Sequence, residues 1–390
     1  MAQAIISRKG GGGGGYATIT FDNVSSLTKT ITSTTFLGCD NSAATTVGDY
    51  ALFGGGSRYT SSGSSYRNGI LACNTSLTTS STTFLSVERA SLVATTVGDY
   101  ALFGGGYNGS HQSTVDAYNS SLTRSTPTAL SVARNGLAAT TVGDYALFGG
   151  GNGSSYSATV DAYNTSLTRS TPTALSVARA NLAATTVGDY ALFGGGYVPN
   201  PSYSTVDAYN TSLTRSTPTE LSFARQQLAA TTVGDYALFG GGVGSSYSAT
   251  VDAYNTSLTR STPTALSVAR YGLAATTVGD YALFGGGYND RSSAIVDVYN
   301  ASLTKSTTTD LSVANRYLAA TSVGNYALFG PTTRADIIDT YYLNNQVLVY
   351  PGTKYKLGSM TDEATSDSMQ MITTTAPITG YIKIKDATIN

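Results

Sequence analysis

Short runs of small, alternating or β-branched residues fill most of the chain, and none of them has a helical period. In one copy, Leu137–Gly151 reads LAATTVGDYALFGGG, and the stretch before it, Ser113–Arg134, reads STVDAYNSSLTRSTPTALSVAR. Such runs, bounded by Gly, Asn and Pro, predict β-strands. The segments AATTV, YALF and TVDAY predict three strands, and SLTRSTPTALSV predicts a fourth, whose Pro suits an edge strand.

This four-strand pattern repeats along the chain. The Tyr of VGDYALF recurs at Tyr50, Tyr100, Tyr145, Tyr190, Tyr236, Tyr281 and Tyr326, so six intervals span 276 residues, a mean period of 46. The Gly-Asp pair between the first two strands suits a type II′ hairpin turn. Four short strands repeated seven times predict an all-β fold, a seven-bladed β-propeller.

Two further features carry a family resemblance. Each unit pairs YALFGGG with a VDAYN-like segment, and an Arg precedes several new blades, at Arg134, Arg179, Arg225 and Arg270. On these motifs, residues 16–345 resemble the kelch-repeat family, which implies a kelch-like propeller. The family's Trp is missing, because the chain contains no Trp. The resemblance concerns the fold, and propellers host many functions.

The ends of the repeat region predict how the ring closes. The segment IIDTYY (Ile337–Tyr342) keeps the Asp and Tyr of the third strand, and residues 26–37 keep the pattern of the fourth. We therefore expect one blade to combine N- and C-terminal strands, which removes exposed sheet edges. The alternative closure takes two strands from the N-terminus, including TITFDN (Thr18–Asn23), where the Asp and Tyr register is poor.

The chain divides into three predicted parts. Residues 1–15 form a tail with six consecutive glycines, residues 16–345 form the propeller, and residues 346–390 form a small β module. That module contains four strand candidates, QVLVYP, KYKLG, SMQMITTTA and TGYIKIKDATI. A module of this size struggles to fold alone, so we expect it to pack on the propeller or on a partner.

Composition narrows the classes of partner. Only 12% of residues are charged and the net charge is −1, which argues against nucleic acid. No apolar run approaches the ~20 residues of a membrane span, and Met1–Lys9 is too short for a secretory signal. Two cysteines make neither a disulfide framework nor a metal site, so Cys39 and Cys73 are expected to be small buried residues.

Variation between the repeats is concentrated on one rim of the predicted disk. The turns VGDY and YNTSLT are nearly the same in every copy; we call their side the invariant rim. The loops after the glycines and the connections between blades differ in length and content; we call their side the variable rim. Its Tyr, Ser, Gly and Asn residues resemble the composition of antibody binding loops. Such residues also suit carbohydrate binding, through aromatic stacking and neutral polar contacts. Loop drift is the alternative explanation, but the equally exposed turns of the invariant rim have not drifted, so we favour a binding face. The predicted binding residues are Tyr59, Tyr66, Tyr107, His111, Tyr156, Tyr197, Tyr203, Tyr247, Tyr271, Tyr288, Asp290, Arg291 and Tyr317.

Catalytic chemistry finds little support in the sequence. His111 is the only His, so no histidine triad or histidine metal cluster can recur between blades. The carboxylates that repeat once per blade, such as Asp116 and Asp161, have the pattern of fold residues. We therefore expect no enzyme activity, no catalytic residue, no cofactor and no metal.

Three functional hypotheses follow. The first is a structural protein of a bacteriophage particle, a head or tail fibre made in the host cytoplasm. Its variable rim would recognise a host-surface glycan or protein, and its termini would attach to other virion proteins. The second is an intracellular kelch scaffold for protein–protein interaction, with a cytoplasmic location. The third is a propeller glycosidase or oxidase. Homo-oligomerisation stays open in all three.

Overall fold

The computed structural model describes residues 24–34, 39–60, 63–199, 201–330 and 336–347, with short strands at 5–6, 19–20, 355–356, 372–374 and 388–389. Every regular element in these residues is a β-strand. Among them, no helix is long and apolar enough to cross a membrane.

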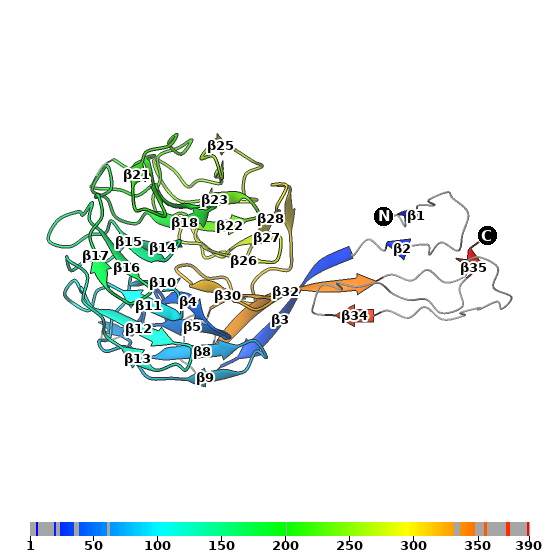
Figure 1. Cartoon of the computed structure of the whole chain (residues 1–390), viewed down its shortest axis with the longest axis horizontal. Helices are drawn as coiled ribbons and strands as arrows, with labels where there is room; N and C mark the ends of the chain where they lie inside the picture. Colours follow the sequence, from blue (N-terminus) through cyan, green and yellow to red (C-terminus); the bar gives the residue numbers. More distant parts are fainter. Residues whose placement is uncertain are drawn as a thin grey trace. The chain divides into compact units, whose positions relative to one another are not determined.

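Each repeat folds into a four-stranded antiparallel sheet, and seven such sheets form a ring (Figure 1). In blades 1 to 6 the strands follow chain order from the axis outward, and the first strands of all neighbouring blades contact one another around the ring. Blade 1 contains β4 (Ala43–Val47), β5 (Tyr50–Gly54), β8 (Ile70–Asn74) and β9 (Thr79–Ser81). A hairpin of β6 (Ser57–Thr60) and β7 (Gly63–Tyr66) lies between its second and third strands.

The next five blades have the same arrangement, and their fourth strands are two or three residues long. Blade 2 is β10 (Val93–Val97), β11 (Tyr100–Gly104), β12 (Val115–Asn119) and β13 (Arg124–Ser125); blade 3 is β14 (Ala138–Val142), β15 (Tyr145–Gly149), β16 (Val160–Asn164) and β17 (Arg169–Ser170). Blade 4 is β18 (Ala183–Val187), β19 (Tyr190–Gly194), β20 (Val206–Asn210) and β21 (Arg215–Ser216); blade 5 is β22 (Ala229–Val233), β23 (Tyr236–Gly240), β24 (Val251–Asn255) and β25 (Arg260–Ser261). Blade 6 is β26 (Ala274–Val278), β27 (Tyr281–Gly285), β28 (Val296–Asn300) and β29 (Lys305–Thr307).

Blade 7 closes the ring from both ends of the chain. Its strand order is β30 (Ala320–Val323), β31 (Tyr326–Phe329), β32 (Ile337–Val347) and β3 (Val24–Ser33). The N-terminal side supplies the fourth strand only, so the favoured closure is confirmed, although β3 begins and ends a few residues before the predicted 26–37. Because β3 enters and β32 leaves beside the repeated turns, the chain joins the ring at the invariant rim.

The hydrophobic core consists of layers between consecutive blades. Between blades 3 and 4, Leu147 and Val160 pack with Phe193 and Tyr209, all of them buried. Gly149, at the end of β15, shows why this strand must end in glycine: a Cβ there would lie 2.7 Å from the ring of Phe193. The same arrangement repeats around the ring, which explains why YALFG is nearly constant.

The chain divides into two compact units: Lys29–Tyr341 is the propeller unit, and Met1–Thr28 with Tyr342–Asn390 is the second. In that unit β1 (Ile5–Ile6) pairs with β2 (Ile19–Thr20), and β33 (Tyr355–Lys356) pairs with β35 (Thr388–Ile389). The end of β32 pairs with β34 (Ile372–Thr374), so Gln346 and Val347 continue a propeller strand rather than begin a new one. The glycine run and the GYIKIK stretch lie outside the described residues, and the predicted domain boundaries stay predictions.

Candidate functional site

A buried ion pair fixes the start of blades 2 to 6, just beneath the variable rim. In blade 4, Arg179 Nη2 lies 2.9 Å from Asp207 Oδ2, and both side chains are fully buried. Arg215, from the fourth strand, reaches the other carboxylate oxygen at 2.7 Å. Burial lowers the pKa of Arg179, and the charge of Asp207 opposes that shift. The same pairing joins Arg89–Asp116, Arg134–Asp161, Arg225–Asp252 and Arg270–Asp297.

A buried tyrosine in the third strand adds a second contact between blades. Tyr209 donates a hydrogen bond from its hydroxyl to Thr173 O of blade 3, at 2.7 Å, and its ring meets Phe193 edge-on. Burial raises the pKa of Tyr209, so the phenol stays neutral. Blades 2 to 7 all have this tyrosine. These repeating carboxylates and phenols hold the frame together, as expected for fold residues.

Blade 1 departs from this chemistry in a coordinated way. Cys39 stands where other blades have the buried Arg, Leu71 replaces the Asp, and Cys73 replaces the Tyr. Both cysteines are buried, as expected, and form no disulfide, and burial raises the pKa of each thiol to about 11. Replacing both members of the ion pair leaves no buried charge without a partner.

Seven residues surround the axis at the variable rim, one from each connection between blades. This collar consists of Asn41, Ser91, Gly136, Asn181, Gln227, Gly272 and Tyr317, and all seven have a φ between 52° and 62°. Each collar amide donates to the carbonyl of the preceding collar residue, and Asn41 N to Tyr317 O, at 3.0 Å, closes the cycle. In blades 2 to 6 the collar residue comes two positions after the buried Arg, and in all seven blades its amide and carbonyl are held by the ring of hydrogen bonds. The backbone is therefore fixed while the side chain varies.

The outer loops are tied to the same connections. Ala180, just before the collar residue Asn181, exchanges two backbone hydrogen bonds with Tyr197, at 3.0 and 2.9 Å. Equivalent bridges join five other connections to the first residue of the adjoining loop. The variable residues therefore sit on one rigid backbone frame.

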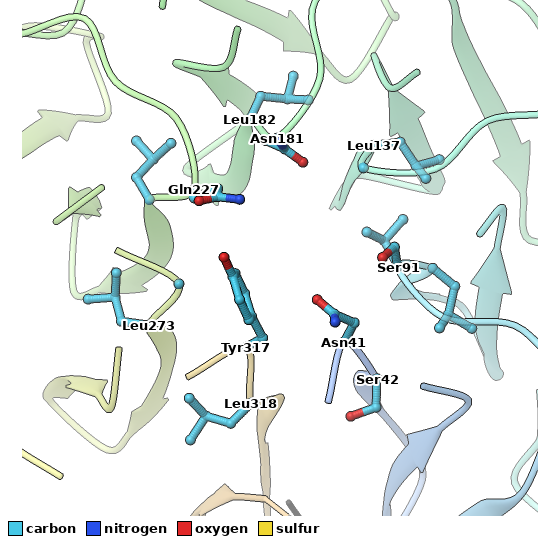
Figure 2. A pocket seen from close by; sticks show the side chains of 15 residues that line it. Asn41, Ser42, Ser91, Leu137, Asn181, Leu182, Gln227, Leu273, Tyr317 and Leu318 are labelled. Atoms are coloured by element: carbon cyan, nitrogen blue, oxygen red, sulfur yellow. The ribbon is translucent and has the colours of Figure 1, made fainter. Parts of the chain in front are cut away.

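The collar encloses a pocket of about 240 Å³ on the axis. Figure 2 shows the side chains of Tyr317, Asn41 and Gln227 reaching toward the opening from different blades. Behind the collar lies a ring of leucines, in which blade 1 alone has Ser42. The described residues that line the pocket include no charged side chain.

Two collar glycines make room for their neighbours. A Cβ on Gly272 would lie 2.9 Å from the ring of Tyr317, and a Cβ on Gly136 would lie 2.9 Å from Oδ1 of Asn181. The residues of adjacent connections therefore depend on one another. Gly272 in one connection leaves room for the ring of Tyr317 in the next.

Many of the predicted binding residues gather in three aromatic clusters. The largest joins blades 5 to 7, where Tyr271 contacts Tyr247, Tyr288 and Tyr317 at centroid distances of 5.6, 5.5 and 6.2 Å. Arg316 lies over the Tyr288 ring, at 4.3 Å. Tyr247 donates a hydrogen bond to Asp290 Oδ1, at 3.1 Å, and burial and this bond raise its pKa.

The other two clusters are smaller. Tyr66, Tyr107 and His111 meet across blades 1 and 2, with centroid distances of 6.1 and 5.4 Å. Tyr156 and Tyr197 meet across blades 3 and 4 at 5.5 Å, and their hydrogen bond raises the pKa of Tyr156 to about 12. Tyr203 and Arg291 lie on the same rim, away from these ring contacts. The side chain of Tyr59 lies outside the described residues.

A second axial cavity, of about 530 Å³, is lined by threonines of the first strands and by the turn residue Gly234 of the invariant rim. Its hydroxyls are engaged between blades: Thr140 and Thr186 share a hydrogen bond of 2.9 Å, and Thr186 also donates to Thr141 O. Within the described part of the chain, no group of three His, Cys, Asp or Glu residues could hold a metal ion.

The sequence-based list missed most of the collar. Asn41, Ser91, Asn181 and Gln227 line the pocket, yet only Tyr317 of the collar was predicted. The available signal was their common position in the repeat, two residues after the Arg in blades 2 to 6, combined with five different residue types at seven equivalent places.

Comparison with known proteins gave no match, either to a protein-family model or to a curated protein sequence. The propeller itself is compatible with a binding or scaffold role. The kelch resemblance stays a sequence-based hypothesis.

Proposed function

We propose that this chain is a non-enzymatic recognition protein whose variable rim binds a ligand at a cell surface. One observation carries the proposal: side chains of changing identity are displayed on a backbone that buried ion pairs and the collar hydrogen bonds hold constant. Antibody loops combine a constant framework with tyrosine, serine, glycine and asparagine in the same way.

The chemistry of the rim supports binding rather than catalysis. The buried carboxylates of blades 2 to 6 are already paired with arginines, and His111 packs against Tyr107. The pocket offers amides, hydroxyls and one aromatic face. Such groups bind neutral polar ligands, in the form of a glycan or a protein surface.

The route of the chain supports attachment from the other side. Strands β3 and β32 meet the ring at the invariant rim, the side opposite the variable rim. With the sequence-based expectation of a virion protein, we propose attachment to a phage particle through the terminal segments and recognition of a host surface through the rim. An intracellular scaffold is the alternative, and it would show one cytosolic protein partner and no cell binding.

The test is adsorption of the fluorescently labelled full chain to a panel of bacterial cells, measured by flow cytometry. A variant with Tyr271→Ala and Tyr288→Ala on the variable rim should lose at least tenfold in adsorption. The matched control, Asp189→Asn with Asp235→Asn, changes two exposed turn residues of the invariant rim and should adsorb normally. Equal loss in both variants, or adsorption to no cell, would overturn the proposal.

A further inference from the structure

We propose that the axial pocket binds one neutral sugar residue of a glycan, with Tyr317 as its stacking face. We further assign the following sugar residues to Tyr271 and Tyr288. This inference rests on the proposed function, because it names the ligand class and the subsite on the same rim.

The first argument is the backbone of the collar. Ser91, Gln227 and Tyr317 adopt a positive φ that favours glycine or asparagine, at a cost of about 1–3 kcal/mol each. Glycine occupies the same position at Gly136 and Gly272, so the fold accepts it there. The larger side chains at the other positions therefore have a reason other than backbone geometry.

The second argument is the seat of Tyr317. Gly272 removes the Cβ that would collide with this ring, and the Tyr317 hydroxyl points toward Gln227 (Figure 2). Burial and the neighbouring Tyr271 raise the pKa of Tyr317 to about 12, so the phenol is neutral at physiological pH. A neutral, half-buried aromatic ring held in one orientation offers an apolar face with a polar tip.

The third argument is the polarity of the pocket. Amides from Asn41, Asn181 and Gln227 surround the opening above a leucine floor. Ser42 Oγ, in the lining, is buried and has no hydrogen-bond partner within the described residues. A hydroxyl-rich ligand satisfies such groups, whereas the lining offers no opposite charge to a charged ligand. The nearest guanidinium, that of Arg316, is engaged over the Tyr317 ring, 5.5 Å from its centroid.

Size and surroundings complete the assignment. A volume of about 240 Å³ is below the ~300–1,000 Å³ of pockets for drug-sized ligands, and suits a single ring. From that ring, Tyr317, Tyr271 and Tyr288 form a continuous aromatic path toward the outer edge of blades 5 to 7. A glycan longer than one residue can follow this path.

The experiment uses the full chain with defined probes. Free glucose, galactose, mannose and N-acetylglucosamine are tested by saturation-transfer NMR, and neutral and acidic oligosaccharides are tested on an array. We expect neutral oligosaccharides to bind, acidic ones to fail, and one of the free sugars to compete.

The variants locate the site. Tyr317→Ala should weaken binding at least tenfold, and Gly272→Ser, which places a side chain in the seat of the ring, should act in the same direction. Tyr317→Phe keeps the stacking face and should stay within about threefold. Tyr156→Ala tests the cluster of blades 3 and 4. Asp189→Asn, on an exposed turn of the invariant rim, is the matched control and should leave binding unchanged. Circular dichroism checks that each variant is folded.

The failures are distinguishable. Sugar binding that is lost in Tyr156→Ala and kept in Tyr317→Ala would overturn the pocket assignment and leave the variable rim as the binding face. Absence of neutral-sugar binding, with rim-dependent adsorption to cells intact, would overturn the sugar class alone. Loss of both would overturn the proposed function.

Discussion

The two rims of the propeller differ in how much of their sequence the fold dictates. On the invariant rim, Asn210 Oδ1 accepts hydrogen bonds from the amides of Ser212 and Thr214, and every complete blade repeats this cap. Gly143, with a φ of 50°, leaves only 3.1 Å between a hypothetical Cβ and Thr211 of the next blade. These turns are constant because packing and hydrogen bonding require it.

The packing of the invariant rim changes how far sequence variation on the variable rim supports a binding role. Constancy on one rim does not by itself show that the other rim was selected for binding, because the two rims face different constraints. The case for binding rests instead on the fixed collar backbone, the coupling of Gly272 with Tyr317, and the neutral pocket. The comparison can be tested by measuring how much stability is lost when residues of the frame and of each rim are substituted.

The largest expected effect is alkaline unfolding of the frame. Burial raises the pKa of six phenols (Tyr118, Tyr163, Tyr209, Tyr254, Tyr299 and Tyr341) above the value of 10.0 in an unfolded chain. Their contribution is fully present below pH 10 and is lost as the pH rises through the folded values, by about 1.4 kcal/mol per pH unit for each phenol. We expect cooperative unfolding above about pH 10 in circular dichroism, with a shallower pH dependence in Tyr209→Phe. An unchanged slope in that variant would refute this account.

The second effect concerns the buried ion pair. Asp207→Leu leaves Arg179 buried without its partner and should lower the free energy of unfolding by about 3–5 kcal/mol, measured with urea. The double variant Arg179→Cys with Asp207→Leu copies the solution of blade 1 and should recover most of this loss. A double variant no more stable than the single one would contradict the role given to the pair.

The third effect tests the closure. Lys29 Nζ lies 3.0 Å from Asp339 Oδ1 and also donates to Asp310 O, at 2.7 Å. Lys29→Ala should destabilise the ring by about 2–3 kcal/mol, because β3 is held in blade 7 without a covalent link to β32. Arg260→Ala, the equivalent change in the continuous blade 5, is the control and should have the smaller effect on the melting temperature.

The smallest effect compares one polar side chain from each rim. Asn210→Ala removes a cap that accepts two amide hydrogen bonds and should lower stability by about 1–2 kcal/mol. Ser91→Ala, in the collar, exchanges two residues that both bear the cost of the positive φ, so it should stay within about 0.5 kcal/mol. A collar variant as costly as the cap variant would show that the variable rim is part of the frame.

Much of the fold could be predicted because the same strand pattern occurs in seven copies along the chain. The hairpins, the seven blades and the closing role of IIDTYY follow from periodicity and from the register of Asp and Tyr. The site was harder to predict, because Asn41 and Gln227 are neither aromatic nor charged. Their importance comes from a ring of hydrogen bonds between residues about 45 positions apart, which no local pattern reveals.

The exception in blade 1 has a consequence for assembly. Five nearly identical blades could dock in the wrong order, or exchange between two copies of the chain. An arginine-bearing connection placed on blade 1 would bury its guanidinium against Leu71, and Cys39 placed on any of blades 2 to 6 would leave an aspartate without its arginine. The first error buries a guanidinium without a carboxylate and costs about 3–5 kcal/mol. The second costs less, because the Arg or Lys of the fourth strand still pairs with the aspartate. Cys39 and Leu71 thus distinguish blade 1 from blades 2 to 6. This difference favours the native order of the blades and closure of the ring within one chain.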